Sequence, residues 1–271
     1  MRRLFFLACS LISITTSAAA SHNIPPDIAP AGKLTAAQIV DRNVAARGGL
    51  EAWRAASTLT LSGQLEAGGK KNSELPFVMK MKRPHMSRLE IRFQDQTAIQ
   101  VYDGEQGWKL RPFLGRDEVE SFTPVEAKAA AAWQELDGPL VDYISKGTKV
   151  ELQGTESVEG HDAYKLKLTM KNGEERHLWV DASSFLELKI DGEQRKLDGK
   201  LHNVAVYYRD YKAENGLTVP HVLETVVEGV KQPHKMHIER VAVNQPMEGA
   251  LFTKPRLTLA NVSVQQADQR P

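Results

Sequence analysis

Apolar and polar side chains alternate with a period of two residues along most of this chain, and turn-forming pairs separate the alternating segments. The alternation is clearest over residues 59–65, 75–82 and 88–93. A period of two is typical of strands that bury one face, and pairs such as Asp103-Gly104 and Asn215-Gly216 favour hairpins. The pattern predicts an antiparallel sheet and argues against a parallel α/β fold.

Further alternating segments bring the predicted total to about ten or eleven strands; they lie near residues 99–101, 108–110, 149–152, 164–170, 176–181, 186–191, 201–208, 218–228 and 235–244. A sheet this wide tends to curl or close, and a wide curled sheet can enclose a cavity. We therefore predict a mainly β fold with some α structure. Its core would be a curled antiparallel sheet of about ten to eleven strands, forming a closed or half-closed barrel whose open mouth the helices cover.

Two capping-box patterns mark the predicted helices. Thr35-Ala-Ala-Gln38 precedes apolar residues at helical spacing and predicts a helix that ends near Arg47. A second short helix follows over residues 50–56. The other pattern, Thr123-Pro-Val-Glu126, predicts a helix that runs on to Leu136 and interrupts the series of strands.

The N-terminus reads as a secretory signal peptide. Two arginines precede an apolar run, and Ala18-Ala19-Ala20 supplies a small-residue cleavage pattern. Cys9, the one cysteine, has too few apolar residues before it to form a lipobox. The predicted organisation is a signal peptide (1–20), a proline-rich and glycine-rich flexible linker (21–33), one domain (34–255) and a flexible tail (256–271).

Composition and motifs exclude several functions. With 35 Lys and Arg against 34 Asp and Glu, the formal net charge of +1 gives no reason to expect a nucleic-acid partner. The sequence contains no zinc-protease, nucleophile-elbow or phosphate-loop motif. His234 and His237 would face opposite sides of a strand, so they do not form a metal site. We predict a chain that is not an enzyme and has no catalytic residue, metal or cofactor.

Several motifs resemble the outer membrane lipoprotein-sorting protein family, and together they span roughly residues 34–255. The matching segments are ARGGLEAWR (46–54), YDGEQGW (102–108), DGPLVDY (137–143), DY (210–211) with GLTVPH (216–221), and the ending at 244–255. None of them is a catalytic signature.

The resemblance implies the fold of the periplasmic lipoprotein carriers LolA and LolB and of the stress sensor RseB. The resemblance therefore implies a curved antiparallel half-barrel, here of about ten to eleven strands, with helices covering a concave face that encloses an apolar cavity. It implies a monomeric periplasmic carrier for a lipoprotein or lipid acyl chain, soluble like LolA because the sequence lacks a convincing lipobox. Two alternatives stay open: a sensor or scaffold that binds an envelope membrane protein, as RseB does, and an uncharacterised enzyme.

A carrier needs a deep apolar pocket, because exposing a 16-carbon acyl chain to water costs about 12 kcal/mol at ~0.8 kcal/mol per methylene. Methionine and aromatic side chains make adaptable walls for such a pocket. The candidate lining residues are the apolar positions of the first five strands: Leu59, Leu61, Phe77, Met79, Met81, Leu89, Ile91, Phe93, Val101, Trp108 and Leu110. The alternative is that these side chains form an ordinary core.

The basic residues between those apolar positions form a second candidate surface. Lys80, Lys82, Arg88 and Arg92 alternate with the apolar side chains of two strands. They could contact a partner protein, although a solvated sheet face would look the same in the sequence.

Overall fold

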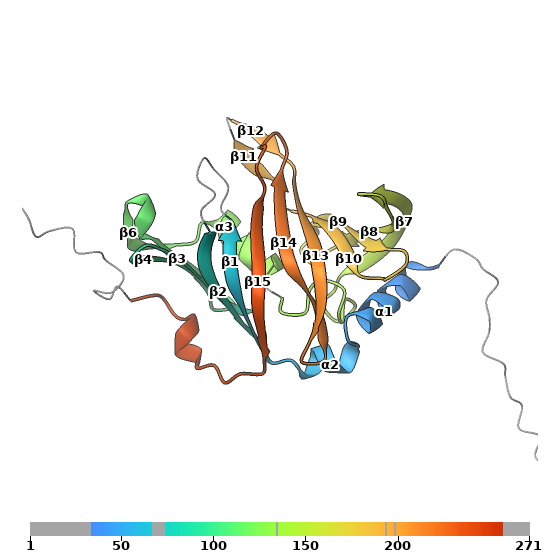
Figure 1. The fold of residues 1–271 in the computed structure, drawn as a ribbon, viewed down its shortest axis with the longest axis horizontal. Helices are drawn as coiled ribbons and strands as arrows, with labels where there is room; N and C mark the ends of the chain where they lie inside the picture. The colour runs from blue at the N-terminus through green and yellow to red at the C-terminus, as the bar shows by residue number, and fades with distance from the viewer. Residues whose placement is uncertain (1–33, 67–73, 134, 193, 198, 257–271) are drawn as a thin grey trace, which may run out of the picture. The chain divides into compact units, whose positions relative to one another are not determined.

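A single antiparallel sheet of thirteen strands dominates the described part of the computed structural model (Figure 1). The structure describes residues 34–66, 74–133, 135–192, 194–197 and 199–256. The predicted signal peptide and linker, and the tail beyond residue 256, lie outside the described residues. The sheet has the order β6-β5-β4-β3-β2-β1-β15-β14-β13-β10-β9-β8-β7, so it is open, with β6 and β7 at its edges.

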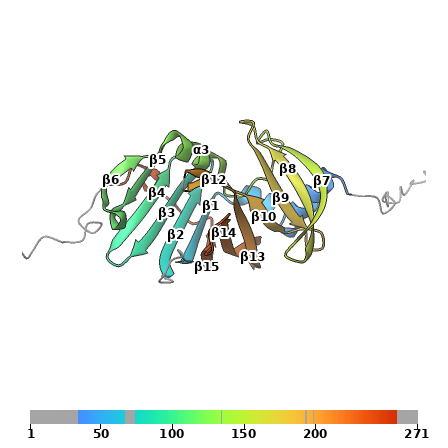
Figure 2. The same ribbon diagram turned by 90° about the horizontal axis from the view of Figure 1, so that it is seen from above.

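The strands of this sheet are β1 (Thr58–Glu66), β2 (Glu74–Lys82), β3 (Met86–Phe93), β4 (Gln96–Tyr102), β5 (Gly107–Arg111), β6 (Arg116–Ser121), β7 (Lys149–Val158), β8 (His161–Thr169), β9 (Glu175–Asp181), β10 (Glu187–Asp191), β13 (Val204–Glu214), β14 (Leu217–Val227) and β15 (His234–Val243). A separate hairpin consists of β11 (Arg195–Leu197) and β12 (Lys200–His202). Seen from above, the sheet curves between its two edges (Figure 2).

The predicted antiparallel, mainly β architecture is confirmed, but the predicted number of strands is too low. The sequence pattern missed β6 and β11. β6 reads RDEVES and has a single apolar residue, so period two leaves no signal there. Its pairing with β5 imposes the strand, because tertiary pairing overrides local propensity.

Pairing between β1 and β15 joins the two ends of the domain near the middle of the sheet. Leu59 lies opposite Val243, and Leu61 lies opposite Val241. The register then shifts between Ser62 and Gly63. Most other neighbouring strands follow each other in the chain. The pairing of β1 with β15 is therefore what brings the N-terminal and C-terminal strands into one continuous sheet.

Within the described ranges, three α-helices accompany the sheet: α1 (Ala36–Ala46), α2 (Leu50–Ala55) and α3 (Pro124–Trp133). Both predicted capping boxes are present. Thr35 Oγ1 accepts a hydrogen bond from the Gln38 amide at 3.2 Å, and the Thr123 amide donates to Glu126 Oε2 at 2.8 Å. α3 ends three residues before the predicted Leu136, which lies instead in a run of turns over 135–148, called here the 135–148 segment.

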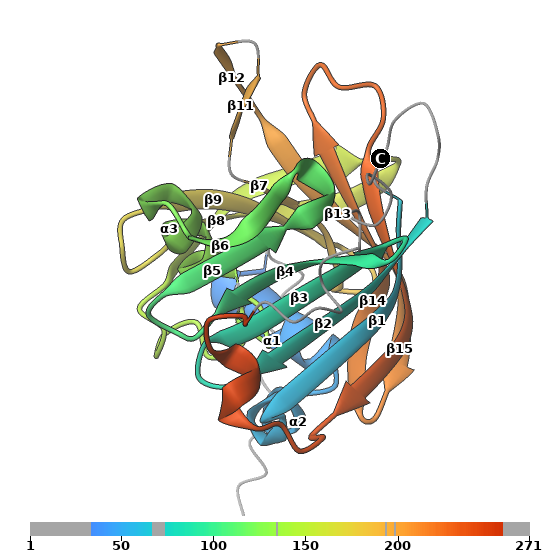
Figure 3. The ribbon, with the colours of Figure 1, turned by 90° about the vertical axis from the view of Figure 1, so that its left-hand side faces the viewer.

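Different segments pack against the two faces of the sheet. We call the face that carries Leu59, Leu61 and Met79 the cavity face; the main buried cluster lies there and includes Ile39 of α1 and Trp53 of α2. The opposite face, called the outer face, is crossed near β3 and β4 by residues 245–256, which contain the 3-10 helix η2 (Gly249–Phe252; Figure 3). A second 3-10 helix, η1 (Pro112–Leu114), joins β5 to β6.

Candidate functional site

A cavity of about 340 Å³ lies on the cavity face, where the sheet meets the 135–148 segment and the α1–α2 junction. Its volume falls within the range of about 300–1,000 Å³ that is usual for small-molecule pockets. Leu136 and Pro139 contribute from the 135–148 segment, and Trp53 contributes from α2. Arg47 contributes from the end of α1, and eight strands from both halves of the sheet supply most of the remaining wall.

Most of the wall is apolar. The aliphatic and methionine side chains from the strands and their ends are Leu59, Leu61, Met79, Met81, Leu168, Met170, Ile190, Val206, Val219, Leu223, Met236 and Ile238. Four of these are methionines, whose unbranched thioethers adapt to irregular ligands. An apolar, adaptable wall of this kind suits a hydrocarbon ligand.

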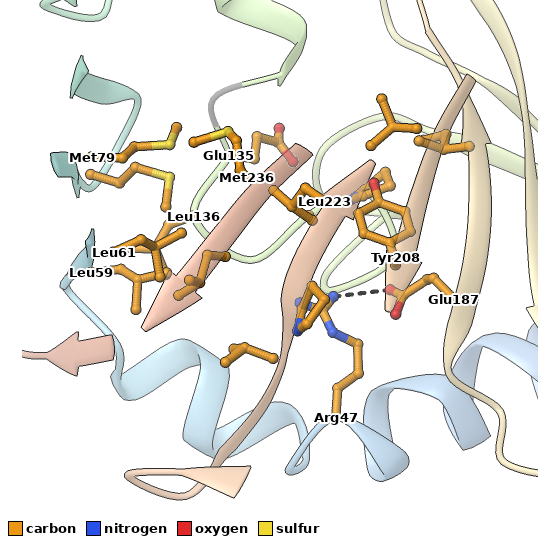
Figure 4. Close-up of a pocket in the computed structure, with 18 of the residues that line it drawn as sticks. Arg47, Leu59, Leu61, Met79, Glu135, Leu136, Glu187, Tyr208, Leu223 and Met236 are labelled. Carbon is orange, nitrogen blue, oxygen red and sulfur yellow. Dashed lines mark hydrogen bonds and ion pairs between the residues drawn. The ribbon is translucent and has the colours of Figure 1, made fainter. Parts of the chain in front are cut away.

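Arg47, Glu187 and Tyr208 form a polar end of the cavity, and a further carboxylate, Glu135, lies near Met236 (Figure 4). Arg47 Nη1 lies 3.1 Å from Glu187 Oε1, and both side chains are buried. The Tyr211 hydroxyl donates to Glu187 Oε2 at 3.0 Å. Met79, Leu61 and Met236 lie toward the other end (Figure 4).

The chain positions Arg47 through the end of α1. Arg47 is the C-cap residue of that helix, and its guanidinium stacks over the Trp53 ring with 4.4 Å between Cζ and the ring centroid. The Trp53 indole nitrogen donates to the Arg47 carbonyl at 2.9 Å. The end of α1 and the Trp53 ring of α2 therefore fix the position of the Arg47 side chain, which extends from there toward the sheet.

Burial dominates the electrostatics at this end of the cavity. Desolvation, and then the charge of Glu187, raise the pKa of the Tyr208 phenol far above its usual value. The same two causes raise the pKa of Tyr211. Both phenols therefore stay protonated, and neither can act as a base near neutral pH.

Buried and half-buried ion pairs hold the 135–148 segment over the cavity. Arg47 Nη1 donates to the Asp137 carbonyl at 2.9 Å. The buried Asp137 carboxylate lies 2.7 Å from Arg83 Nη2 through one oxygen and 2.7 Å from Lys146 Nζ through the other. Arg54 also reaches Asp142 at 2.6 Å. The segment is thus attached to α1, to α2 and to the turn after β2.

The structure brings four of the predicted residues to the cavity: Leu59, Leu61, Met79 and Met81. Phe77 is buried on the same face, and Leu89 and Ile91 pack against the same cluster, but these three do not line the cavity. Phe93, at the end of β3, is 36% exposed.

Val101, Trp108 and Leu110 lie on the outer face, so they do not line this cavity. They pack with Phe252 of η2 in a separate cluster. The alternation changes parity at the turn between β3 and β4, where Phe93 pairs with Gln96. A turn of two residues places an odd-numbered residue beside an even-numbered one, and the apolar positions after it therefore point the other way.

The sequence prediction missed the wall supplied by the C-terminal half and the whole polar end. Leu223 and Met236 lie opposite each other in β14 and β15 and both line the cavity. The sequence predicts strands at both positions from the alternation of apolar and polar residues. That alternation does not show that β15 pairs with β1, which places these residues at the cavity. No local signal identified the pairing of Arg47 with Glu187, which are 140 residues apart.

The described residues show neither a metal centre nor a membrane span. Within the described ranges, no three His, Cys, Asp or Glu side chains gather closely enough to hold a metal ion. His237 Nε2 instead lies 2.9 Å from Glu66 Oε1. None of the described helices is long and apolar enough to cross a membrane.

Solved structures with a similar fold share little sequence with this chain. A LolA superfamily protein from Nitrosomonas europaea is 16% identical, with a TM-score of 0.55 over 82% of this chain and 99% of its own. This chain has a LolA-like fold. A domain from Vibrio parahaemolyticus, named for outer membrane lipoprotein sorting, is 13% identical, with a TM-score of 0.53 over 80% of this chain and 95% of its own.

The LolA-like fold is shared with a DUF1329 family protein from Desulfovibrio piger. That protein is 16% identical, with a TM-score of 0.57 over 82% of this chain and 98% of its own. A family model described as an uncharacterized protein matches residues 141–258. A comparison with curated proteins finds no match. The resemblance inferred from the sequence motifs is therefore confirmed at the level of fold.

Proposed function

We propose that this chain binds an acyl chain of a lipoprotein or lipid in the cavity and carries it through the periplasm. One observation carries the proposal: an apolar cavity of about 340 Å³, walled by strands from both halves of the sheet and covered by the 135–148 segment. The LolA-like fold supports it, because one protein with this fold is named for lipoprotein sorting. The predicted signal peptide agrees with export.

The physical reason is the cost of exposing hydrocarbon to water. At ~0.8 kcal/mol per methylene, burying half of a 16-carbon chain is worth roughly 6 kcal/mol. Binding itself costs several kcal/mol in lost freedom of motion. A cavity of this size therefore gives reversible binding of one chain, which is what a carrier needs.

A fluorescent 16-carbon fatty acid tests the cavity directly. Met79 and Val78 are neighbours in β2 that point to opposite faces, so Met79→Glu and Val78→Glu place the same charge on the two sides of one strand. We expect Met79→Glu to weaken binding at least tenfold and Val78→Glu to change it less than twofold. Equal binding by both variants, with intact far-ultraviolet circular dichroism, would contradict the proposed site.

Co-purified lipid tests the function itself. The chain is purified from the envelope of a Gram-negative cell, and the extracted lipid is identified by mass spectrometry. Acylated peptide or phospholipid at near-stoichiometric amounts supports the carrier. Empty protein that captures an inner-membrane protein supports the sensor instead, and hydrolysis of a lipid or peptide substrate would contradict both functions.

A further inference from the structure

A second hollow, of about 650 Å³, lies on the outer face of the sheet between β3, β4 and residues 245–256. Figure 3 shows η2 lying across these strands. The charged and hydroxyl side chains that line the hollow are Arg88, Glu90, Arg92, Thr97, Thr253, Lys254 and Arg256. This hollow shares no lining residue with the cavity on the other face.

Hydrogen bonds and a buried aromatic ring fix the wall made by residues 245–256. Arg88 Nη1 donates to the Leu251 carbonyl at 3.1 Å, and Lys82 Nζ donates to the Met247 carbonyl at 2.7 Å. Phe252 is only 1% exposed and packs against Ile99 and Leu110. The segment is therefore anchored on the sheet, and the hollow beside it is a defined part of the fold.

The charges around the hollow do not balance. Four of the lining residues are basic and one is acidic. Arg88 Nε lies 2.6 Å from Glu90 Oε1, so the single carboxylate is already paired. Among the described residues, Arg92, Lys254 and Arg256 take part in no ion pair or side-chain hydrogen bond. Three positive charges therefore face one hollow with no counter-charge from the described chain.

Some cations elsewhere on the sheet do have acidic partners. Arg209 lies 2.6 Å from Glu159, and Lys165 lies 2.8 Å from Glu156. A solvated basic surface needs no hollow and usually places acidic side chains among its cations. The three cations around this hollow have no such partner and line one concave site, so a bound anion would relieve their mutual repulsion.

We propose that this hollow binds a phosphate group, carried by a soluble phosphoester or by an anionic phospholipid headgroup. A guanidinium presents parallel N–H donors that match phosphate oxygens, and a lysine adds a point charge. Arg92 and Arg256 supply the guanidinium groups, Lys254 supplies the ammonium, and Thr97 supplies a hydroxyl. The basic row of β3 that the sequence shows as a surface pattern thus forms one wall of a ligand site.

Two probes distinguish the sources of the phosphate. The full chain is titrated with glycerol phosphate by calorimetry and is sedimented with vesicles of phosphatidylglycerol in phosphatidylcholine, both at low salt. Binding of glycerol phosphate identifies a soluble ligand, whereas binding to the vesicles alone identifies a headgroup. Raising the salt to about 0.5 M should weaken either interaction, because exposed charges are then screened.

Two double variants locate the site. Arg92→Gln with Lys254→Gln removes two charges from the hollow, and Lys200→Gln with Lys231→Gln removes two exposed charges from other parts of the surface. All four side chains are exposed, so neither variant should alter the thermal midpoint. We expect the first pair to weaken binding about tenfold and the second to leave it within twofold.

Threefold or greater weakening that is confined to the first pair supports the proposal. A smaller difference between the two double variants would overturn it, as would a wild-type chain that binds neither probe. The fatty-acid measurement of the cavity is independent of this result, because the two sites lie on opposite faces of the sheet.

Discussion

Arg47 connects three parts of the chain that are far apart in sequence. Its carbonyl accepts from Trp53 and from the Thr218 amide, while its guanidinium meets Glu187 and the Asp137 carbonyl. The Nε atom of Arg47 is buried without a hydrogen-bond partner in the described structure. A buried arginine with one donor unsatisfied depends strongly on the carboxylate that it does contact.

Removing that carboxylate should therefore destabilise the fold. We expect Glu187→Ala to lower the free energy of unfolding by about 3–5 kcal/mol, because it leaves the Arg47 charge buried and unpaired. Urea denaturation followed by circular dichroism measures the change. Glu51→Ala is the control, since Glu51 makes an exposed contact with Arg54 and its loss should leave the midpoint unchanged. Equal midpoints for the two variants would show that the buried pair contributes nothing.

Asp181 ends β9 and closes the following turn through one carboxylate oxygen. The amide and hydroxyl of Ser183 donate to Oδ1 at 2.9 and 2.5 Å, and those of Ser184 donate at 2.7 and 3.0 Å. Burial alone would raise the pKa of Asp181, but these four hydrogen bonds outweigh it and lower the pKa to about 2.

This lowered pKa predicts a loss of stability in acid. A carboxylate that titrates lower in the folded than in the unfolded chain stabilises the fold above the unfolded value of 3.8, and its contribution disappears as the pH falls from about 4 to 2. The shift corresponds to about 2 kcal/mol. Urea denaturation gives the free energy of unfolding of the wild type and of Asp181→Asn at each pH. We expect the difference between them, wild type minus variant, to fall by about 2 kcal/mol as the pH drops from about 4 to 2. A difference that stays constant with pH would contradict the assignment.

Elements defined by local sequence were predictable. The two capping boxes place their hydrogen bonds within three residues, so Thr35 and Thr123 mark helix starts without knowledge of the rest of the fold. Short turns likewise reveal hairpins. β6 was not predictable, because its strand conformation comes from pairing with β5. Its charged sequence suits an edge strand, where charges discourage pairing with another chain.

The lining of the candidate site was predictable only where the alternation in the sequence showed which residues share one face of the sheet. In β1 and β2 the odd-numbered apolar residues all point to the cavity face, because odd-numbered Leu59 pairs with odd-numbered Met81. The two-residue turn after Phe93 reverses the parity and moved Val101 and Leu110 to the outer face. The wall from β13 to β15 depends on a register between β1 and β15 that no local pattern encodes.

That register also depends on close contact between two backbones. A Cβ atom added at Gly63 would lie 1.9 Å from the His237 carbonyl oxygen, so no side chain fits there. We expect Gly63→Ala to cost about 1–3 kcal/mol by overpacking. Gly249→Ala is the control, since a Cβ there meets nothing within 4 Å. Thermal melts compare the two, and an unchanged midpoint for Gly63→Ala would mean that the strands can separate at little cost.

At the scale of the whole domain, the open sheet presents two different surfaces. The cavity face holds an apolar site under the 135–148 segment, and the outer face holds the basic hollow beside residues 245–256. An apolar cavity that stays empty leaves its lining atoms without contacts on one side. When a hydrocarbon chain enters the cavity, the free energy of unfolding of the whole domain should therefore increase.

Occupancy of the cavity should thus raise the thermal midpoint. A ligand that binds only the folded state at 100 times its dissociation constant adds about 2.7 kcal/mol. For a domain of this size, this corresponds to a rise of about 5–10 °C, measured by calorimetry with a 16-carbon fatty acid. A four-carbon acid at the same concentration should give no rise, because it buries too few methylenes. The Met79→Glu variant should also show none. A rise that persists in Met79→Glu would place the acyl site outside this cavity, since binding anywhere on the folded chain stabilises it by the same mass action.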